Sequence, residues 1–389
     1  MFKKILHTAD WHVRDKDIEE ILKCTSFLIE TARQEKVNLI VIAADIFDSR
    51  DIKLDCPSAR LAIRSISELA DIAPVVIPLG TASHDGTAPE VLKYAKGKHD
   101  IIVASTPDQA HFYGGAVVTL IPQPTKQFFQ TQSDIATSNV EITQAMNGLF
   151  MGMGARAAEY PDAPHILVGH WNVAGSKLST GQVLIGHEID IPFDSMMLAD
   201  PDLICLGHIH LPQQIGDRAF YSGSLYPLTW GEMEAKGFYI HTLDGKKLVE
   251  SRFIETPTRK LIRFKFDLTD EFADYLSLND RLLKENYEEA VKGAFVRMDV
   301  TVWQDKASEI DKEATKEYCV SAGALDVDIR IIRVPRQTVR SESVLKVESL
   351  RDKLVAMAAI KEETVPESIL TKADDLEVGP SEDVIRRAA

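Results

Sequence analysis

The sequence contains 389 residues, of which 45% are hydrophobic and 26% are charged, a composition typical of a globular protein with a large buried core. No apolar run approaches the ~20 residues that span a bilayer, so we expect no association through a membrane span. The net charge of −15 argues against a broad nucleic-acid-binding surface, because phosphate contacts require Lys and Arg. Carboxylates that hold divalent metals are an exception, since the bound metal removes their repulsion of phosphate.

The opening residues and the cysteines indicate a cytoplasmic protein. MFKKILHTAD passes from two lysines directly into a strand with polar residues, which is not the pattern of a secretory signal. The cysteines lie far apart, without the spacing of a zinc site or a disulfide framework: Cys24, Cys56, Cys205 and Cys319. We therefore expect a soluble, unexported chain.

Up to about residue 255, short apolar strands alternate with amphipathic stretches, which is the pattern of a layered α/β domain. Apolar residues at helical spacing between Ile18 and Ala32 predict a helix after the first strand. The predicted strands are 5–8, 39–43, 75–79, 101–104, 117–121, 166–168 and 203–206. Most are continuously hydrophobic, so we expect both faces of the sheets to be covered.

A smaller α/β domain is predicted for residues 256–340, with strands at 260–266, 294–302 and 326–334 and a helix at 306–317. Residues 342–360 have helical periodicity, and the last thirty residues form an acidic tail. The sequence thus predicts three segments: 1–255, 256–340 and 341–389.

Residues able to bind metals follow five of the predicted strands. They are Asp10 and His12, Asp45 and Asp48, His84 and Asp85, His170, and His208 and His210. The loops that leave the carboxyl ends of strands in a layered α/β fold converge on one crevice, so we expect these side chains to meet. Imidazole and carboxylate ligands together favour divalent manganese, iron or zinc, and two such ions can bind a phosphodiester for in-line hydrolysis.

Each fragment alone also has an ordinary explanation. Asp45 and Asp48 could be turn or helix-capping carboxylates, and His170 could be a hydrogen-bonded core residue. His208 and His210 carry the strongest single signal, because two histidines directly after a buried strand both need partners. The order of all five fragments is more specific than any member. For the remaining histidines we expect packing or surface positions, and for Cys205 the role of a small buried apolar residue.

The ordered fragments DWH, ADIFD, SHDG, GHW and GHIH resemble the calcineurin-like metallophosphoesterase superfamily, whose motifs are D-x-H, G-D-x-x-D, G-N-H-D/E, G-H and G-H-x-H. The stretches ILVGHWNVAGSKLSTGQVLIGHEIDI and FYSGSLYPLTWGEMEAKGFYIHTL are similar to its SbcD-type exonuclease branch. The resemblance covers residues 1–255 closely and the rest loosely. It implies an α/β/β/α sandwich core with a smaller α/β capping domain and a C-terminal helix.

The resemblance implies two divalent metal ions, most simply Mn²⁺, with Fe²⁺ or Zn²⁺ as alternatives. The first ion would be held by Asp10, His12, Asp45 and His210. Asp45 would bridge to the second ion, which His170 and His208 would complete.

The same resemblance makes His84 the group that orients the phosphate or protonates the leaving oxygen. Asp85 would fix the tautomer of His84, and Asp48 would support a ligand from behind.

Two positions depart from the family's motifs. Ala44 replaces the glycine before Asp45, a change expected to affect mainly how the turn packs. Ser83 stands where the family has a metal-binding asparagine, and a serine hydroxyl is a shorter and weaker donor. Three readings follow from Ser83: an active enzyme with a weaker second site, a one-metal enzyme, or a catalytically silent scaffold. Activity is favoured because the other ligand positions and His84 are all present.

The later segments also match the family in outline. Its members cap the active site with a domain that places DNA and bind an SbcC-type ATPase through C-terminal helices; homodimers are expected too. Arg330, Arg333, Arg336 and Arg340 are candidates for phosphate contacts, or else charged residues that protect a strand edge. The helix at 342–360 would dock the ATPase or pack on its own domain.

The first functional hypothesis is therefore a manganese-dependent DNA nuclease, exonucleolytic and endonucleolytic on single strands, in DNA repair or recombination. The second is a hydrolase of cyclic nucleotides or other small phosphodiesters on the same metal core. The third is a non-catalytic assembly protein whose second metal site is degraded at Ser83.

Overall fold

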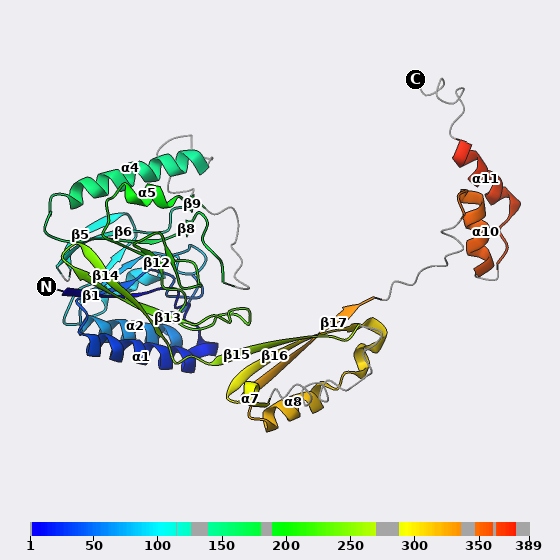
Figure 1. Cartoon of the computed structure of the whole chain (residues 1–389), viewed down its shortest axis with the longest axis horizontal. Helices are drawn as coiled ribbons and strands as arrows, with labels where there is room; N and C mark the ends of the chain where they lie inside the picture. Colours follow the sequence, from blue (N-terminus) through cyan, green and yellow to red (C-terminus); the bar gives the residue numbers. More distant parts are fainter. Residues whose placement is uncertain are drawn as a thin grey trace, which may run out of the picture. The chain divides into compact units, whose positions relative to one another are not determined.

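The computed structural model describes residues 2–113, 115–125, 139–179, 189–269, 288–335, 347–360 and 363–378 (Figure 1). Two compact units are distinguished. The first comprises Met1–Lys265, Leu278–Asp299 and Lys312–Arg330, and the second Phe266–Ser277, Val300–Asp311 and Ile331–Ala389. Within the described segments, no helix has the length and apolar character needed to cross a bilayer.

Two six-stranded sheets form the body of the first unit. One has the order β14-β13-β1-β2-β3-β4, with bounds Lys247–Glu255, Gly237–Asp244, Phe2–Thr8, Leu39–Ile42, Val75–Pro78 and Ile101–Ala104. The other has the order β11-β12-β10-β7-β6-β5, with bounds Gln213–Ile215, Ala219–Tyr221, Leu203–Gly207, His165–His170, Ala116–Ile121 and Asp108–Tyr113. Strands β1 to β4 run parallel, as do β6, β7, β10 and β12, so their carboxyl ends share one edge of each sheet.

Helices cover the outer face of each sheet (Figure 1). On the first sheet lie α1 (Ile18–Glu35) and α2 (Pro57–Ala70), and on the second lie α4 (Asn139–Ala157) and α5 (Phe193–Met197). Short 3₁₀ helices occur at Asp15–Asp17 and Ala88–Tyr94, and the small strands β8 (Asn172–Val173) and β9 (Asp190–Ile191) pair with each other. The helix predicted after the first strand is thus confirmed as α1.

The alternation of side chains along the strands explains the layers. Leu6 and Ile40 pack among the residues of α1 and α2, whereas their neighbours Ile5 and Leu39 pack against the second sheet. In the second sheet Leu167 faces the helical side, in the cluster that includes α4 residues. Three apolar layers therefore separate four layers of backbone, and the predicted α/β/β/α sandwich is confirmed. Both faces of the central strands are covered, as their continuous hydrophobicity indicated.

A separate three-stranded sheet has the order β15-β16-β17, with bounds Lys260–Asp267, Ala294–Trp303 and Asp326–Val334. The helix α7 (Glu288–Val291) precedes β16. The helix predicted for 306–317 is instead a 3₁₀ helix, Gln304–Glu309, followed by α8, Lys312–Ser321. Ile310 between them has extended backbone angles of −78° and 109°, which interrupt the helix.

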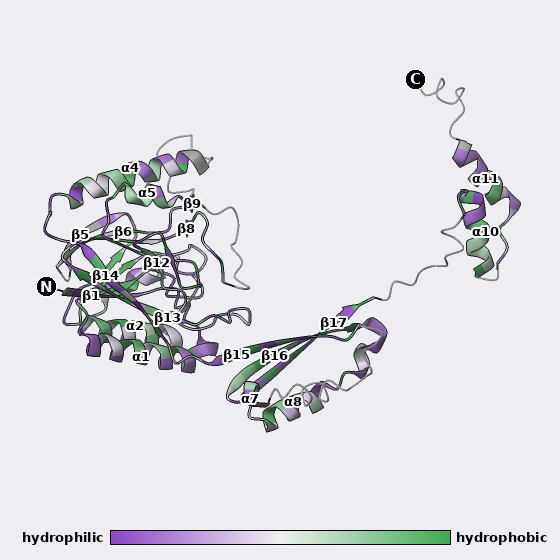
Figure 2. Cartoon of the chain, viewed as in Figure 1, coloured by the Kyte–Doolittle hydropathy of each residue, from purple (hydrophilic) through white to green (hydrophobic). Residues whose placement is uncertain are grey.

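Two C-terminal helices pair with each other. In α10 (Leu350–Ile360), Arg351 forms ion pairs with Asp374, at 2.6 Å, and Glu367, at 2.7 Å, both in α11 (Glu367–Val378). The helix α11 lies in the segment expected to be an acidic tail. Residues 342–346 of the predicted helix lie outside the described residues. Figure 2 shows hydrophobic and hydrophilic residues alternating along both helices.

Candidate metal centre

Side chains from both sheets meet where their parallel strands end. Asp10 and His12 follow β1, and Asp45 follows β2, all from the first sheet. His170 is the last residue of β7, and His208 and His210 follow β10, both in the second sheet. All of these are buried except His210, which is partly exposed.

Asp45 lies at the middle of this group. Its Oδ2 is 3.2 Å from Nε2 of His170 and 3.8 Å from Nε2 of His12. Potential ligand atoms lie within 4.8 Å of one another in three overlapping sets: Asp10, His12 and His210; Asp10, Asp45 and His170; His12, Asp45 and His84. The ring of His208 is 5.2 Å from that of His170. The structure therefore brings together Asp10, His12, Asp45, His170, His208 and His210, but not Ser83, from the residues that the sequence selected as metal ligands.

The backbone at this centre adopts an unusual conformation. Seven non-glycine residues of the described chain have positive φ, and five belong here: Asp10, His12, Ala44, Asp45 and His208. Left-handed backbone costs energy for residues with a Cβ and occurs mostly where a function requires it. For Ala44, with φ of 73°, the consequence of replacing glycine is backbone strain rather than altered packing of the turn, which corrects the expectation from sequence.

The donor set fits divalent cations. Both ring nitrogens of His12 are buried without a hydrogen-bond partner, a costly state that a bound cation would relieve. Within the described part of the chain, no Lys or Arg is paired with the buried carboxylates of Asp10 and Asp45. Imidazoles and carboxylates in this combination suit manganese, iron or zinc.

Charges within the cluster are strongly coupled. Burial raises the pKa of Asp10, against the attraction of His170 and His210. Burial also opposes ionisation of Asp45, but the neighbouring His170 and His12 hold its pKa well below the usual range. Although burial acts in the opposite direction, the Asp45 carboxylate raises the pKa of His170 to about 9. Without a metal, a proton on His170 thus supplies part of the positive charge that Asp45 requires.

Backbone and side-chain contacts orient two of the histidines. Nδ1 of His170 donates to the Ala43 carbonyl at 2.8 Å, which directs Nε2 toward Asp45. Nδ1 of His210 lies 3.1 Å from Oε1 of Glu232. Lys236, which is fully buried, pairs with Glu232 at 2.7 Å and donates to the His210 carbonyl at 3.0 Å. Burial alone would raise the pKa of Glu232, yet His210 and Lys236 lower it to about 2.

Glu232 and Lys236 were not selected from the sequence. They lie in WGEMEAKG, and no spacing relates that stretch to His210. The only available signal is two acids and a lysine within an otherwise small and apolar segment.

The loop after β3 contains a third residue that the sequence analysis missed, Thr81. Its Oγ1 is 2.9 Å from each carboxylate oxygen of Asp45, and its amide donates to Oδ1 at 2.7 Å. Gly80 packs so closely that a Cβ there would overlap Oδ1 of Asp45. Ser83, the expected oxygen donor, is instead exposed, and its carbonyl accepts from the Arg50 amide. Thr81, rather than Ser83, is therefore the hydroxyl residue of this loop that contacts Asp45.

His84 reaches the centre, but its partner differs from the expected one. Its ring lies 4.6 Å from that of His12, and Nδ1 donates to the carbonyl of Asp48 at 3.1 Å. The Asp85 carboxylate does not hold this ring; it accepts from the amides of Phe47, at 3.0 Å, and Gly80, at 3.2 Å. Asp85 thus connects the loop that contains Asp45 to the loop after β3.

The fully buried Asp85 has a perturbed pKa. Burial, followed by the negative charge of Asp45, raises its pKa to about 7.

The side chain of Asp48 lies beside His12, with Oδ1 4.0 Å from Nδ1 of His12 and 3.4 Å from Nη1 of Arg14. The sequence analysis expected Asp48 to support a ligand, and its carboxylate lies near His12 without a hydrogen bond to it.

A second cluster of potential ligands, His7, Cys205 and His241, lies between the sheets. Nε2 of His7 donates to the Leu206 carbonyl at 3.1 Å, so Nδ1 accepts from Nε2 of His241 at 3.3 Å, and Nδ1 of His241 accepts from the Ser251 hydroxyl at 2.8 Å. Each imidazole nitrogen therefore has a role in one hydrogen-bonded chain, which fits packing rather than metal binding.

The arginine candidates are only partly described. Arg330 and Arg333 are exposed on β17, with Nε of Arg330 3.8 Å from Asp328. Arg336 and Arg340 lie outside the described residues.

The chain was compared with known protein families, sequences and structures. Residues 3–212 match the family model described as calcineurin-like phosphoesterase. The chain is 25% identical to the SbcD component of nuclease SbcCD from Staphylococcus epidermidis, covering 73% of this chain and 77% of the relative. It is 27% identical to the protein of the same name from Escherichia coli, covering 68% and 71%. A dimetal phosphatase from Danio rerio is similar in structure with a TM-score of 0.42 and 10% identity, covering 65% of this chain and 99% of that one.

Proposed function

The chain belongs to the calcineurin-like phosphoesterase family, and we propose that it is a metal-dependent DNA nuclease, with exonuclease and single-strand endonuclease activity. We propose further that it is the nuclease component of an SbcCD-like complex that processes DNA ends in repair or recombination. The observation that carries the proposal is the convergence of Asp10, His12, Asp45 and His170 from two sheets at one buried centre. Support for the substrate comes from the two relatives that are named as components of nuclease SbcCD.

The ligands divide into two sets that share Asp45. Asp10, His12, Asp45 and His210 would hold one divalent cation, and Asp45, His170 and His208 the other, with Mn²⁺ the preferred ion and Fe²⁺ or Zn²⁺ as alternatives. When bound, such a pair supplies charge neutralisation for a phosphodiester and lowers the pKa of a water for in-line attack.

His84 is the proposed general acid or phosphate-orienting group. Because Nδ1 donates to the Asp48 carbonyl, Nε2 is the atom left to meet a phosphate or leaving oxygen. Asp85 is the proposed positioning residue: by accepting from Phe47 and Gly80 it holds the loops of Asp45 and His84 together. Asp48 is proposed to orient His84, whose Nδ1 donates to the Asp48 carbonyl, while its carboxylate lies beside Nδ1 of His12.

The partners follow from the same proposal. Residues 256–340 would be the capping domain that positions DNA, with Arg330, Arg333, Arg336 and Arg340 contacting backbone phosphates. The segment 341–389 would dock an SbcC-type ATPase through α10 and α11, whose exposed apolar side chains include Val355, Ile360 and Leu376. We propose a homodimer in the cytoplasm, a compartment that agrees with four free cysteines.

The deciding experiment is a nuclease assay on end-labelled duplex and hairpin DNA with Mn²⁺, comparing the wild-type protein with Asp45→Ala. We expect metal-dependent degradation by the wild type and none by the variant. Hydrolysis of a small chromogenic diester without any degradation of DNA would favour the small-phosphodiester enzyme instead. A purified protein that binds no metal in Mn²⁺ would favour the non-catalytic assembly protein.

A further inference from the structure

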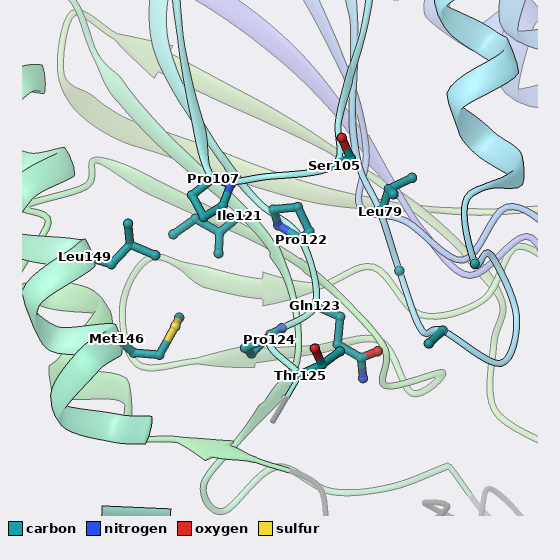
Figure 3. Close-up of a pocket in the computed structure, with 13 residues that line it drawn as sticks. Leu79, Ser105, Pro107, Ile121, Pro122, Gln123, Pro124, Thr125, Met146 and Leu149 are labelled. Carbon is teal, nitrogen blue, oxygen red and sulfur yellow. The ribbon is translucent and has the colours of Figure 1, made fainter. Parts of the chain in front are cut away.

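A cavity of about 190 Å³ lies beside the metal centre (Figure 3). It opens at the carboxyl ends of β3, β4 and β6, where Leu79, Ser105 and Ile121 contribute to its wall. Figure 3 shows Met146 and Leu149 of α4 closing the opposite side. The cavity therefore lies at the same edge of the two sheets as the proposed metal centre, at the ends of the neighbouring strands β3 and β6.

One loop belongs to both sites. Gly80 and Ala82 line the cavity, whereas Thr81, between them, binds the carboxylate of Asp45 through its amide and hydroxyl. His84 follows two residues later, with its ring 4.6 Å from that of His12. A phosphate held at the metal centre would thus be separated from the cavity only by the backbone of residues 80–82.

The lining of the cavity does not suit a phosphate group. Its described side chains include no charged group, and much of the wall is apolar, with Pro107, Pro122, Met146 and Leu149 among its members. The amide of Gln123 adds a hydrogen-bond donor and an acceptor at the same wall. Aliphatic walls suit the flat faces of an aromatic ring, a thioether makes favourable contacts with such rings, and an amide can pair with polar ring edges.

We propose that this cavity receives the nucleobase of a nucleotide adjoining the phosphodiester that is cleaved. The proposal rests on the proposed nuclease function and assigns it a base-binding subsite. The base stacks against the proline and methionine side chains, and Gln123 contacts its edge. Binding of this kind tolerates many sequences, because every base has a flat face. It anchors the strand so that the adjoining phosphate is held at the metals.

The test compares two single-stranded DNA substrates that differ only by an abasic tetrahydrofuran residue next to the scissile bond. We expect wild-type protein with Mn²⁺ to cleave the intact strand roughly ten-fold or more faster at subsaturating substrate, the usual scale of one stacked base. Leu149→Trp, which fills the cavity, should lower cleavage of the intact strand to the abasic rate. Gln123→Ala should reduce the preference without filling the cavity.

Met151→Trp is the matched control, because Met151 is on the same helix and 58% exposed. It should keep the wild-type preference, and metal content and thermal unfolding of every variant report an intact centre and fold. Equal cleavage of intact and abasic strands by the wild type would overturn the base subsite while leaving the nuclease function standing. A metal-loaded protein that cleaves neither strand would overturn the proposed function, and the subsite with it.

Discussion

The carboxylate of Asp45 lies 3.2 Å from the imidazole of His170, although Asp45 follows a strand of one sheet and His170 ends a strand of the other. Burial raises the cost of an unpaired carboxylate, so Asp45 depends on positive charge that only its neighbours or a cation can provide. This relationship makes Asp45 the residue on which both halves of the centre depend.

Asp45→Asn should remove most of the metal binding while preserving the shape of the side chain. Wild-type protein should gain about 2.7 kcal/mol of unfolding free energy at a free Mn²⁺ concentration of about 100 times Kd, because the ion binds only the folded state. The unfolding free energy of the variant should rise little on addition of Mn²⁺. Elemental analysis after dialysis, together with denaturant unfolding with and without Mn²⁺, measures both effects; a variant that retains two ions per chain contradicts the shared role of Asp45.

His84→Ala should leave the bound metal unchanged and lower the turnover number by about 10²- to 10⁴-fold, the usual range for a proton-transferring group. A larger effect on kcat than on KM is expected, since His84 would act on the departing oxygen. Steady-state kinetics on labelled DNA provide the measurement. Loss of metal in this variant would make His84 a ligand instead, as its proximity to His12 and Asp45 permits.

Thr81→Val removes one hydroxyl and little volume, and should weaken Mn²⁺ binding by roughly 10- to 100-fold at one of two sites, the effect of losing a supporting group at a metal centre. Ser83→Ala is the control, because Ser83 is exposed. Isothermal titration calorimetry measures the Mn²⁺ affinity of both variants. If the serine variant weakens binding and the threonine variant does not, the assignment must be reversed.

The buried pair His7 and His241 should make the protein less stable in mild acid. Burial lowers the pKa of His7 to about 3, and burial followed by the charge of His7 lowers the pKa of His241 well below 6.5. The unfolded chain therefore binds protons as the pH falls below 6.5, while the folded chain does not. The associated stability is fully present above pH 6.5 and is lost as the pH falls toward 3.

At one pH unit below 6.5 the loss should be about 1.4 kcal/mol for each histidine. His7→Gln keeps a donor for the Leu206 carbonyl but does not titrate, so its unfolding free energy should fall less between pH 7.5 and 5.5. Urea unfolding of both proteins at the two pH values measures the difference. An equal fall in unfolding free energy between pH 7.5 and 5.5 in the two proteins would mean that His7 is charged in the folded state.

Leu376→Asp should weaken binding of the SbcC-type ATPase, because Leu376 is 74% exposed on α11 and a charge there opposes apolar docking. We expect a loss of roughly ten-fold or more, with no change in nuclease activity of the isolated chain. Thr371→Asp adds the same charge at another exposed position of α11 and serves as control. Equal affinities of the two variants, measured by surface plasmon resonance, would place the docking surface elsewhere.

Much of the sandwich could be predicted because its strands are buried on both faces and are therefore continuous apolar runs. The proposed metal ligands were selected for a related reason: Asp45 and His208 each come just after such a run. The helix at 306–317 was less predictable, since the interruption at Ile310 is a local backbone choice that its periodicity does not reveal.

The supporting contacts could not be obtained from spacing. Counting back from His84 selects Ser83, whereas counting forward from Gly80 selects Thr81, and only the coordinates show which hydroxyl meets Asp45. Glu232 reaches His210 from a loop 22 residues farther along the chain, and no periodicity links them. Likewise, the resemblance to the family assigned Asp85 to His84, but the backbone turns its carboxylate toward the amides of Phe47 and Gly80.

The distribution of the ligands along the chain, from position 10 to position 210, also determines when the centre can form. A nascent chain that has released only β1 to β4 from the ribosome exposes Asp10, His12 and Asp45 without the later histidines that complete either set. The cage exists only after β10 and His210 have been synthesised and both sheets have closed on each other. A cation bound by this complete set would therefore be acquired late, after folding, and would not guide the first steps of folding.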